Sequence, residues 1–335
     1  MDTGGDIWGI AIAGDRLLWS GDEGVFGMWD LTGKSEPLTW RARGTTITAV
    51  AFREDGAAFA TGGEDGRVSL WRRDSDPSGF RETPLETGAA PGQPTGTIMD
   101  LTFSPDGRLL AAGDNGSRVL LWDLASLRRL RTWEVAGGTT DLAFSPDSRR
   151  LAVVNGGNQQ ITLLDPQREG VPNQLAGDCP RVFSVAFHGE GRFLVTGCED
   201  GSLEHLEISP WRSLGRLRAY GEFVYSLSPI RDGKTIAAGT SDGRVLVWDF
   251  AEESWTRRAC RRANRNLPDD IKNRSALPSD LCSRLLRDAP PEPPGLQLES
   301  EPDREYLPDN VAQWLRVQPW FVLGQRLAGV LAAPR

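Results

Sequence analysis

Three short apolar runs separated by two turns form a unit that recurs along most of the chain. In residues 97–124 the runs are 98–103, 109–112 and 119–122, with Ser-Pro-Asp-Gly in the first turn and Asp-Asn-Gly in the second. Gly, Pro, Asn and Asp favour the backbone dihedrals of tight turns, so each unit is predicted to form three antiparallel strands. Three strands cannot cover both of their own faces, and the unit must therefore pack against copies of itself.

The last apolar residue of the third run recurs at nearly constant intervals, which read 42, 51, 42, 42 and 42 residues. The longer interval contains residues 72–96, which are rich in Pro and Gly and are predicted to form a surface loop. The markers that define the intervals are Trp29, Trp71, Trp122, Leu164, Leu206 and Trp248. A period of about 40–45 residues with four strands per unit is typical of β-propeller blades.

A Trp-Asp dipeptide ends the third run at Trp29, Trp122 and Trp248. Together with the period and the turns, this dipeptide resembles the WD-repeat family over most of the chain. The resemblance implies an all-β propeller over residues 6–250 with six recognisable blades, and it leaves a seventh blade open because WD propellers commonly have seven. No spare strand precedes the first blade, so the outer edge of the last blade is expected to be closed from elsewhere or to stay incomplete.

The markers are predicted to be structural, because neighbouring blades cover both faces of a third strand. In WD-repeat proteins a His at the blade entrance, a Ser or Thr on the second strand and an Asp in the next turn brace the marker Trp. No His precedes any first strand here, and Leu replaces Trp at two markers. The remaining candidates are Ser20, Thr61 and Thr196 on second strands and Asp65, Asp200 and Asp242 in turns. Each Asp is expected to cap its own turn.

The character of the sequence changes after residue 250. Apolar residues recur at four-residue steps from Trp255 to Leu267, which predicts an amphipathic helix within a helical segment, 251–288, packed on the propeller. The candidate contacts for an acidic partner on its opposite arc are Arg258, Arg261, Arg262 and Arg265. Residues 254–267 also resemble the tail after the last WD repeat in bacterial multidomain signalling proteins, where the propeller accompanies an NTPase, kinase or protease-like module. This resemblance implies a bacterial signalling or effector partner.

Two further segments complete the chain. Residues 289–309 are rich in Pro and acidic residues and are predicted to form an extended tether. Residues 310–335 are predicted to form amphipathic helices with large apolar side chains, among them Trp314, Trp320 and Phe321. Such side chains avoid water, so they are expected to cover a groove of the propeller or of another protein.

Composition argues against several classes of protein. A net charge of -8 and an isoelectric point near 5.1 disfavour a nucleic-acid binder, because contact with phosphates needs a basic surface. No apolar run reaches about 18 residues, so no membrane span is expected. The acidic N-terminus is unlike a secretory signal, which predicts a cytoplasmic protein. The four cysteines form no close pair in the sequence, so neither a disulfide framework nor a zinc site is expected.

Residue spacing yields no catalytic, cofactor-binding or metal-ligating set. His188 is predicted to lie in a turn between first and second strands and His205 in a third strand, and neither has a Cys, Asp or Glu at ligand spacing. The sequence therefore favours a non-catalytic scaffold or sensor module that binds other proteins. The alternative is a propeller enzyme, a metal-assisted hydrolase or lyase, with its site at the central channel. A third hypothesis is a peripheral membrane scaffold that uses residues 310–335.

Overall fold

The computed structural model of the 335-residue chain describes residues 6–250 except 43–44, 75–78, 89–95, 157–159, 169–172, 219–222 and 230–233. The predicted segments 251–288, 289–309 and 310–335 lie outside the described residues. The candidate partner-binding residues that lie there with them are Arg258, Arg261, Arg262, Arg265, Trp314, Trp320 and Phe321. Their roles stay predictions.

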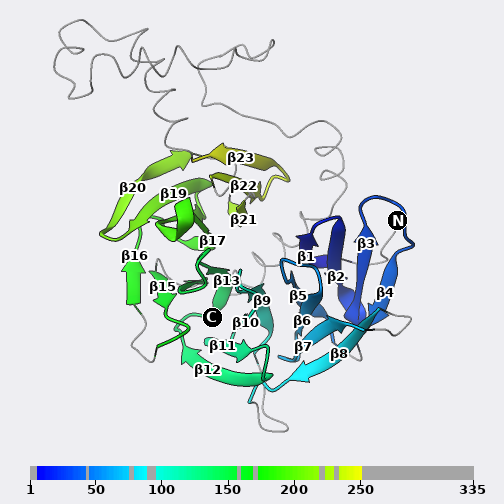
Figure 1. The fold of residues 1–335 in the computed structure, drawn as a ribbon. Helices are drawn as coiled ribbons and strands as arrows, with labels where there is room; N and C mark the ends of the chain where they lie inside the picture. Colours follow the sequence, from blue (N-terminus) through cyan, green and yellow to red (C-terminus); the bar gives the residue numbers. More distant parts are fainter. Residues whose placement is uncertain are drawn as a thin grey trace, which may run out of the picture.

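Six small antiparallel sheets are arranged around a common centre (Figure 1). Each sheet is one blade, and the predicted all-β propeller with six blades is thereby confirmed. Within the described residues the helical elements are two single 3-10 turns, η1 (Asp22–Gly24) and η2 (Gly189–Gly191).

The strands follow one another around the ring in chain order. They are β1 (Ile7–Ala13), β2 (Arg16–Gly21), β3 (Val25–Asp30) and β4 (Leu38–Arg41) in blade one; β5 (Ile47–Phe52), β6 (Ala58–Gly63), β7 (Val68–Arg73) and β8 (Phe80–Leu85) in blade two; β9 (Ile98–Phe103), β10 (Leu109–Asp114), β11 (Arg118–Asp123) and β12 (Arg128–Glu134) in blade three; β13 (Thr139–Phe144), β14 (Leu151–Asn155), β15 (Gln160–Leu164) and β16 (Asn173–Ala176) in blade four; β17 (Val182–His188), β18 (Phe193–Cys198), β19 (Ser202–Ile208) and β20 (Trp211–Arg218) in blade five; and β21 (Val224–Pro229), β22 (Thr235–Thr240) and β23 (Val245–Asp249) in blade six.

Blade six differs from the others in its outer edge. Blades one to five have four strands each, whereas the part of blade six that the structure describes has three. An incomplete outer edge is one of the two outcomes that the sequence predicts for the last blade.

The first strand of every blade lies nearest the centre. These strands lie side by side in the order β1, β5, β9, β13, β17 and β21 (Figure 1). Each of them has a register shift near its beginning, which marks a β-bulge. A bulge turns the next side chain to a new direction, so the residue that follows it can reach the neighbouring blade.

Consecutive strands in a blade are antiparallel, so the connections fall at two opposite ends of the propeller. Turns between first and second strands and loops between third and fourth strands lie at one end, the turn rim. Turns between second and third strands and the connections between blades lie at the other end, the entrance rim. The turn rim includes Ser104, whose hydroxyl accepts a hydrogen bond from the Leu109 N–H at 2.9 Å and donates one to Asp106 at 2.6 Å.

Apolar clusters fill the spaces between blades that follow one another in the chain, from blade one to blade six. The space between blades two and three contains Leu70 from one side and Trp122 and Leu120 from the other. Trp122 is fully buried, and its Nε1–H donates to the Glu86 carbonyl oxygen at 3.0 Å. Burial on both faces explains why third strands are continuous apolar runs rather than alternating ones.

The prediction of a surface loop over residues 72–96 is wrong for residues 80–85. They form β8, the outer strand of blade two, which pairs antiparallel with β7. Phe80 is buried, and its ring centroid lies 5.0 Å from that of Phe59. Pro84 obscures this strand in the sequence, but an edge strand tolerates Pro because its outward-facing groups need no partner in the sheet.

Candidate functional site

The turn rim has a cavity at the centre of the propeller. Its volume is about 470 Å³, and residues of blades two to six line it. The ends of four first strands supply apolar walls that include Phe103, Phe144, Phe187 and Leu227. The cavity is therefore the mouth of the central channel.

The acidic side chains of this cavity have no basic counterpart among the described residues that line it. Glu54 and Glu190 are exposed residues of the turns that follow β5 and β17, so they stand at the mouth. Asp141 precedes the end of β13 by three residues, which places it roughly 10 Å deeper along the strand. No Lys or Arg is among the described residues that line this cavity.

Asp141 belongs to a pair of aspartates that follow the bulges of neighbouring first strands. The Asp100 carboxylate accepts a hydrogen bond from the Leu142 N–H at 2.8 Å, and the Asp141 carboxylate accepts one from the Val185 N–H at 2.7 Å. The two carboxyl groups also hydrogen-bond to each other.

Burial raises the pKa of Asp100 to about 7. Burial, together with the negative charge of Asp100, raises the pKa of Asp141 well above its usual range. The pair thus shares a proton near neutral pH and ties blades three, four and five together.

A histidine pair adjoins the same cavity. His188 is the last residue of β17, so its predicted position in a turn is wrong, whereas His205 does lie in a third strand, β19. Their Nε2 atoms are 2.9 Å apart, and the ring centroids of Phe193 and Phe250 lie 5.1 Å and 4.9 Å from that of His188. Burial lowers the pKa of both histidines to about 4. His188 lines the cavity but adds no positive charge to it at neutral pH.

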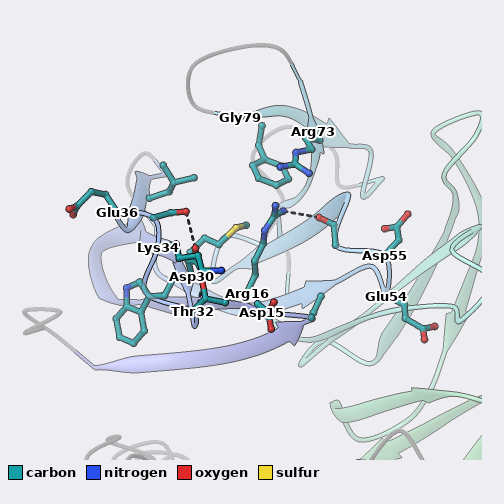
Figure 2. A pocket seen from close by; sticks show the side chains of 18 residues that line it. Asp15, Arg16, Asp30, Thr32, Lys34, Glu36, Glu54, Asp55, Arg73 and Gly79 are labelled. Atoms are coloured by element: carbon teal, nitrogen blue, oxygen red, sulfur yellow. Dashed lines mark hydrogen bonds between the residues drawn. The ribbon is translucent and has the colours of Figure 1, made fainter.

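A second cavity, of about 610 Å³, lies between blades one and two on the turn rim (Figure 2). Its lining mixes three basic residues with five acidic ones, which are Arg16, Lys34, Arg73, Asp15, Asp30, Glu36, Glu54 and Asp55. Asp30 organises its loop, because its carboxylate accepts hydrogen bonds from the Thr32 N–H and the Ser35 hydroxyl, both at 2.8 Å. The hydrogen bond from the Thr32 hydroxyl is the largest cause that lowers the pKa of Asp30. This second cavity has no single charge preference.

The entrance rim of blade two holds part of the predicted bracing set. The Trp71 Nε1–H donates to the Thr61 hydroxyl at 3.1 Å, and Thr45 at the blade entrance accepts from the Asp65 N–H at 3.2 Å. Asp65 also caps its turn by accepting from the Arg67 N–H at 3.1 Å. Thr45 thus makes the entrance contact where the family has His.

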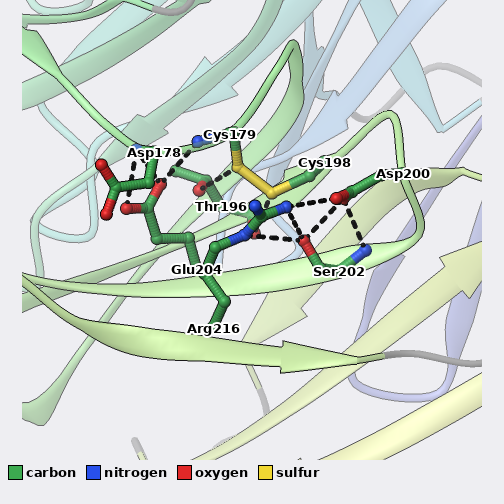
Figure 3. Close-up of a disulfide and its surroundings, with 8 residues drawn as sticks. All are labelled: Asp178, Cys179, Thr196, Cys198, Asp200, Ser202, Glu204 and Arg216. Carbon is green, nitrogen blue, oxygen red and sulfur yellow. Dashed lines mark hydrogen bonds and ion pairs between the residues drawn. A yellow bond between two sulfur atoms is a disulfide. The ribbon is translucent and has the colours of Figure 1, made fainter.

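The entrance rim of blade five uses a different brace. Cys179, at the blade entrance, forms a disulfide with Cys198 at the end of β18 (Figure 3). The prediction that the cysteines would not pair is wrong for these two, because they are distant in sequence but meet where the entrance crosses the second strand. Thr196, the predicted second-strand residue, lies 3.5 Å from the Cys179 Sγ, and the marker it would have braced is Leu206.

Two side chains hold the ends of this brace in place. Fully buried Glu204 accepts hydrogen bonds from the N–H groups of Asp178 and Cys179, at 2.9 Å and 3.3 Å. Asp200 accepts from the Ser202 N–H at 3.2 Å and forms an ion pair with Arg216. The contacts of Asp200 cap the turn that follows β18 (Figure 3), which is the role expected of this residue.

The six markers occupy equivalent positions on third strands, but their exposure differs. Trp122, Leu164 and Leu206 are fully or almost fully buried, whereas Trp29 and Trp248 are half-buried. None of the six markers is among the described residues that line the cavity at the channel mouth.

The acidic residues of the channel mouth escape the sequence prediction. A usable signal exists, because Asp-Leu followed by a residue and Phe occurs at Asp100 and again at Asp141, the same position of two consecutive units. A buried polar side chain needs a hydrogen-bond partner or water. An acidic residue repeated on inner strands therefore indicates contact with the next blade or with the channel.

The described residues include no cluster of three or more His, Cys, Asp or Glu side chains suited to a metal ion. Within the same part of the chain, no helix has both the length and the apolar character needed to cross a bilayer.

A sequence profile described as "WD domain, G-beta repeat" matches residues 36–72, 87–123, 173–204 and 211–249. The chain contains WD40 repeats. Each matched repeat ends within the third strand of a blade. The repeats at 36–72, 173–204 and 211–249 begin at or near the outer strand of the preceding blade. A WD40 repeat of this kind therefore covalently links two neighbouring blades.

Curated proteins with WD40 repeats are similar to parts of this chain. WD repeat-containing protein SL1-17 of Schistosoma mansoni is 32% identical over 93 residues, which are 28% of this chain and 31% of that protein. Serine-threonine kinase receptor-associated protein of Gallus gallus is 22% identical over 247 residues, which are 73% of this chain and 67% of that protein. Actin-interacting protein 1 of Drosophila melanogaster is 27% identical over 152 residues, or 44% of this chain and 25% of that protein. The similarity thus spans less than a third of the first and third relatives and about two thirds of the second.

Proposed function

We propose that this protein is a non-catalytic scaffold that binds other proteins through the cavity at the channel mouth. The observation that carries the proposal is a cavity of about 470 Å³ with apolar walls and a few polar groups. Sites that bind ligands or anchoring side chains have volumes of about 300–1,000 Å³ and this kind of lining. Five blades contribute to it, so the packing of the ring sets its shape before a partner arrives.

The names of similar proteins support the proposal that this chain binds other proteins. The names of two of them state a protein contact, with a serine-threonine kinase receptor in one case and with actin in the other. For this chain, a bacterial signalling or effector partner is a finer proposal that rests on the resemblance of residues 254–267. The relatives named above are eukaryotic and lend that proposal no support. A cytoplasmic location is likewise a proposal from the sequence.

Site-specific photo-crosslinking in cells that express the protein tests the binding surface. A benzoyl-phenylalanine is placed at Glu190 on the turn rim or, as a matched control, at Glu64 on the entrance rim, since both side chains are exposed. We expect a discrete covalent adduct with another protein from position 190 and none from position 64. Thr102 lines the cavity, so Thr102→Trp should block it and remove the adduct. Adducts from position 64 alone, or adducts at 190 that Thr102→Trp leaves unchanged, would contradict the proposal.

A further inference from the structure

We infer that the cavity at the channel mouth is a docking site for the chain's own arginine-rich segment, residues 257–265. The inference rests on the proposed function, because the segment would occupy the same cavity as a partner. An external partner would then have to displace the segment before it binds.

The described chain ends beside this cavity. Phe250 follows β23 and is buried, and its ring centroid lies 4.9 Å from that of His188, a residue of the cavity wall. The Phe250 N–H also donates to the Lys234 carbonyl oxygen at 2.7 Å, which fixes the chain at the turn rim. An extended chain covers about 3.3–3.6 Å per residue, so the four residues from 251 to 254, which precede the predicted helix, can span roughly 13–14 Å. Residues 257–265 are therefore within reach of the cavity.

The charges of the segment and of the cavity are complementary. Five of the nine residues in 257–265 are arginines, and the segment has no acidic residue. At the cavity, Glu54 and Glu190 stand at the mouth, and no Lys or Arg is among the described residues that line it. The carboxyl group of Asp141 lies deeper and, because its pKa is raised, holds a proton until a cation approaches it. Guanidinium groups form paired hydrogen bonds with carboxylates, and their stems pack on apolar walls.

The deeper carboxyl group is suited to receive a cation. Asp141 already accepts a hydrogen bond from the Val185 N–H at 2.7 Å, and it shares a proton with Asp100. A guanidinium that approaches Asp141 favours the ionised form, so docking would release the shared proton. Among the described residues, the other titratable groups that face this space are Glu54, Glu190 and His188. His188 is neutral above about pH 5 because burial lowers its pKa to about 4.

The other cavity on the turn rim does not offer this match. Its lining sets Arg16, Lys34 and Arg73 beside its acidic residues, so those carboxylates already have cationic neighbours with which the segment would compete. It also lies between blades one and two, whereas Phe250 packs on blade five. Charge and position together favour the channel mouth.

Limited trypsinolysis of the full-length protein tests the inference, since trypsin cleaves after arginine. The rate of cleavage within 257–265 is followed by mass spectrometry and compared with the rate for a synthetic peptide of residues 251–268. We expect the segment in the intact protein to be cleaved at least about tenfold more slowly than the peptide at low salt. Raising the salt concentration to about 0.5 M should reduce this protection, because exposed charge pairs are screened.

A double variant separates docking at the cavity from general attraction to an acidic protein. Glu54→Gln with Glu190→Gln should speed cleavage within 257–265 by at least about fivefold. The matched control, Glu64→Gln with Glu134→Gln, removes the same charge from exposed residues at the entrance rim and should change the rate by less than about twofold.

Equal effects of the two double variants would overturn the inference, as would cleavage of the intact protein as fast as the free peptide. Either result leaves the proposed function standing if position 190 still crosslinks to another protein. If position 190 gives no adduct while the segment is protected, the proposed function falls and the cavity serves the segment alone.

Discussion

Two pairs of side chains near the channel make opposite contributions to the pH dependence of stability. The pKa of His188 and of His205 is about 4 in the fold, against about 6.5 for an unperturbed histidine. Between these values the unfolded chain binds more protons, so the free energy of unfolding falls as the pH drops from about 6.5 to 4. Asp100 and Asp141 have raised pKa values, so the folded chain binds more protons there than the unfolded chain does. Their contribution to the free energy of unfolding is therefore lost as the pH rises toward 7 and beyond.

Replacing one histidine should therefore protect the protein from acid. In His205→Gln, the side-chain amide can still donate a hydrogen bond to the His188 Nε2, but the position no longer titrates. We expect the drop in Tm between pH 7.5 and pH 5 to be smaller than in the wild type by about 2 °C or more. Differential scanning calorimetry at the two pH values measures this drop. Parallel Tm changes in both proteins would show that the histidine pair does not titrate on unfolding.

Replacing one aspartate of the pair should stabilise the protein at high pH. The amide of Asp141→Asn can donate to Asp100 and accept from the Val185 N–H, so the contacts between blades remain while one buried charge is removed. We expect the free energy of unfolding to rise by about 1 kcal/mol at pH 8, with a smaller gain at pH 5. Urea denaturation at both pH values measures it.

The matched control for this variant is Asp123→Asn. The pKa of Asp123 is lowered, first by the hydrogen bond from the Ser126 hydroxyl, so its ionised form is favoured in the fold. The control should not stabilise the protein at pH 8. A loss of stability in Asp141→Asn at pH 8 would mean that both carboxylates are accommodated in ionised form.

At the level of strands, the marker position predicts where a Trp matters most. Trp122 is fully buried between blades two and three, whereas Trp29 at the equivalent position of blade one is half-buried. Trp122→Ala should lower the free energy of unfolding by about 3–5 kcal/mol. Trp29→Ala removes the same atoms from a less covered site and should lower it by clearly less, about 1–2 kcal/mol. Equal losses in urea denaturation would contradict the difference in burial.

The disulfide at the entrance of blade five should stabilise that blade. Cys179 and Cys198 are separated by 19 residues, and closing a loop of this length restricts the unfolded chain by about 3 kcal/mol. Cys179→Ala with Cys198→Ala should therefore lower the unfolding free energy by about that amount without reductant. With dithiothreitol present throughout a denaturant titration, the wild type should lose most of its advantage over the variant. An advantage that reductant leaves intact would show that the two thiols do not form the bond.

The sequence predicts the strands whose apolar pattern repeats. The structural features that it does not predict depend on contacts between segments that are distant in the sequence. The resemblance to WD-repeat proteins implies Thr61 as the brace of Trp71, and the 42-residue spacing suffices for the six blades. It does not suffice for β8, because Pro84 and nearby charges hide a strand that needs only one sheet partner. The disulfide and the histidine pair join residues 17 to 19 positions apart, which become neighbours only when adjacent strands align.

Across the whole molecule, the apolar clusters between blades make each blade depend on the next one. Ala186, Val195 and Leu203 of blade five are buried against Val224 and Ile236 of blade six. Removing blade six would expose this apolar face to water at a cost of about 25 cal/mol per Å² of apolar area. Propellers gain stability from neighbour contacts in this way, as other repeat proteins do.

Two truncated chains separate this dependence from any effect of the C-terminal residues. A chain that ends at residue 250 keeps blade six, whereas a chain that ends at residue 218 lacks it. We expect the shorter chain to have a Tm lower by at least about 10 °C than the longer one, or to bind a hydrophobic dye strongly, because the face of blade five is uncovered. Thermal denaturation followed by circular dichroism, with dye fluorescence in parallel, makes the comparison. Equal Tm values and weak dye binding in both chains would mean that blade five is stable without its neighbour, and the contacts between these two blades would then contribute little to the stability of the ring.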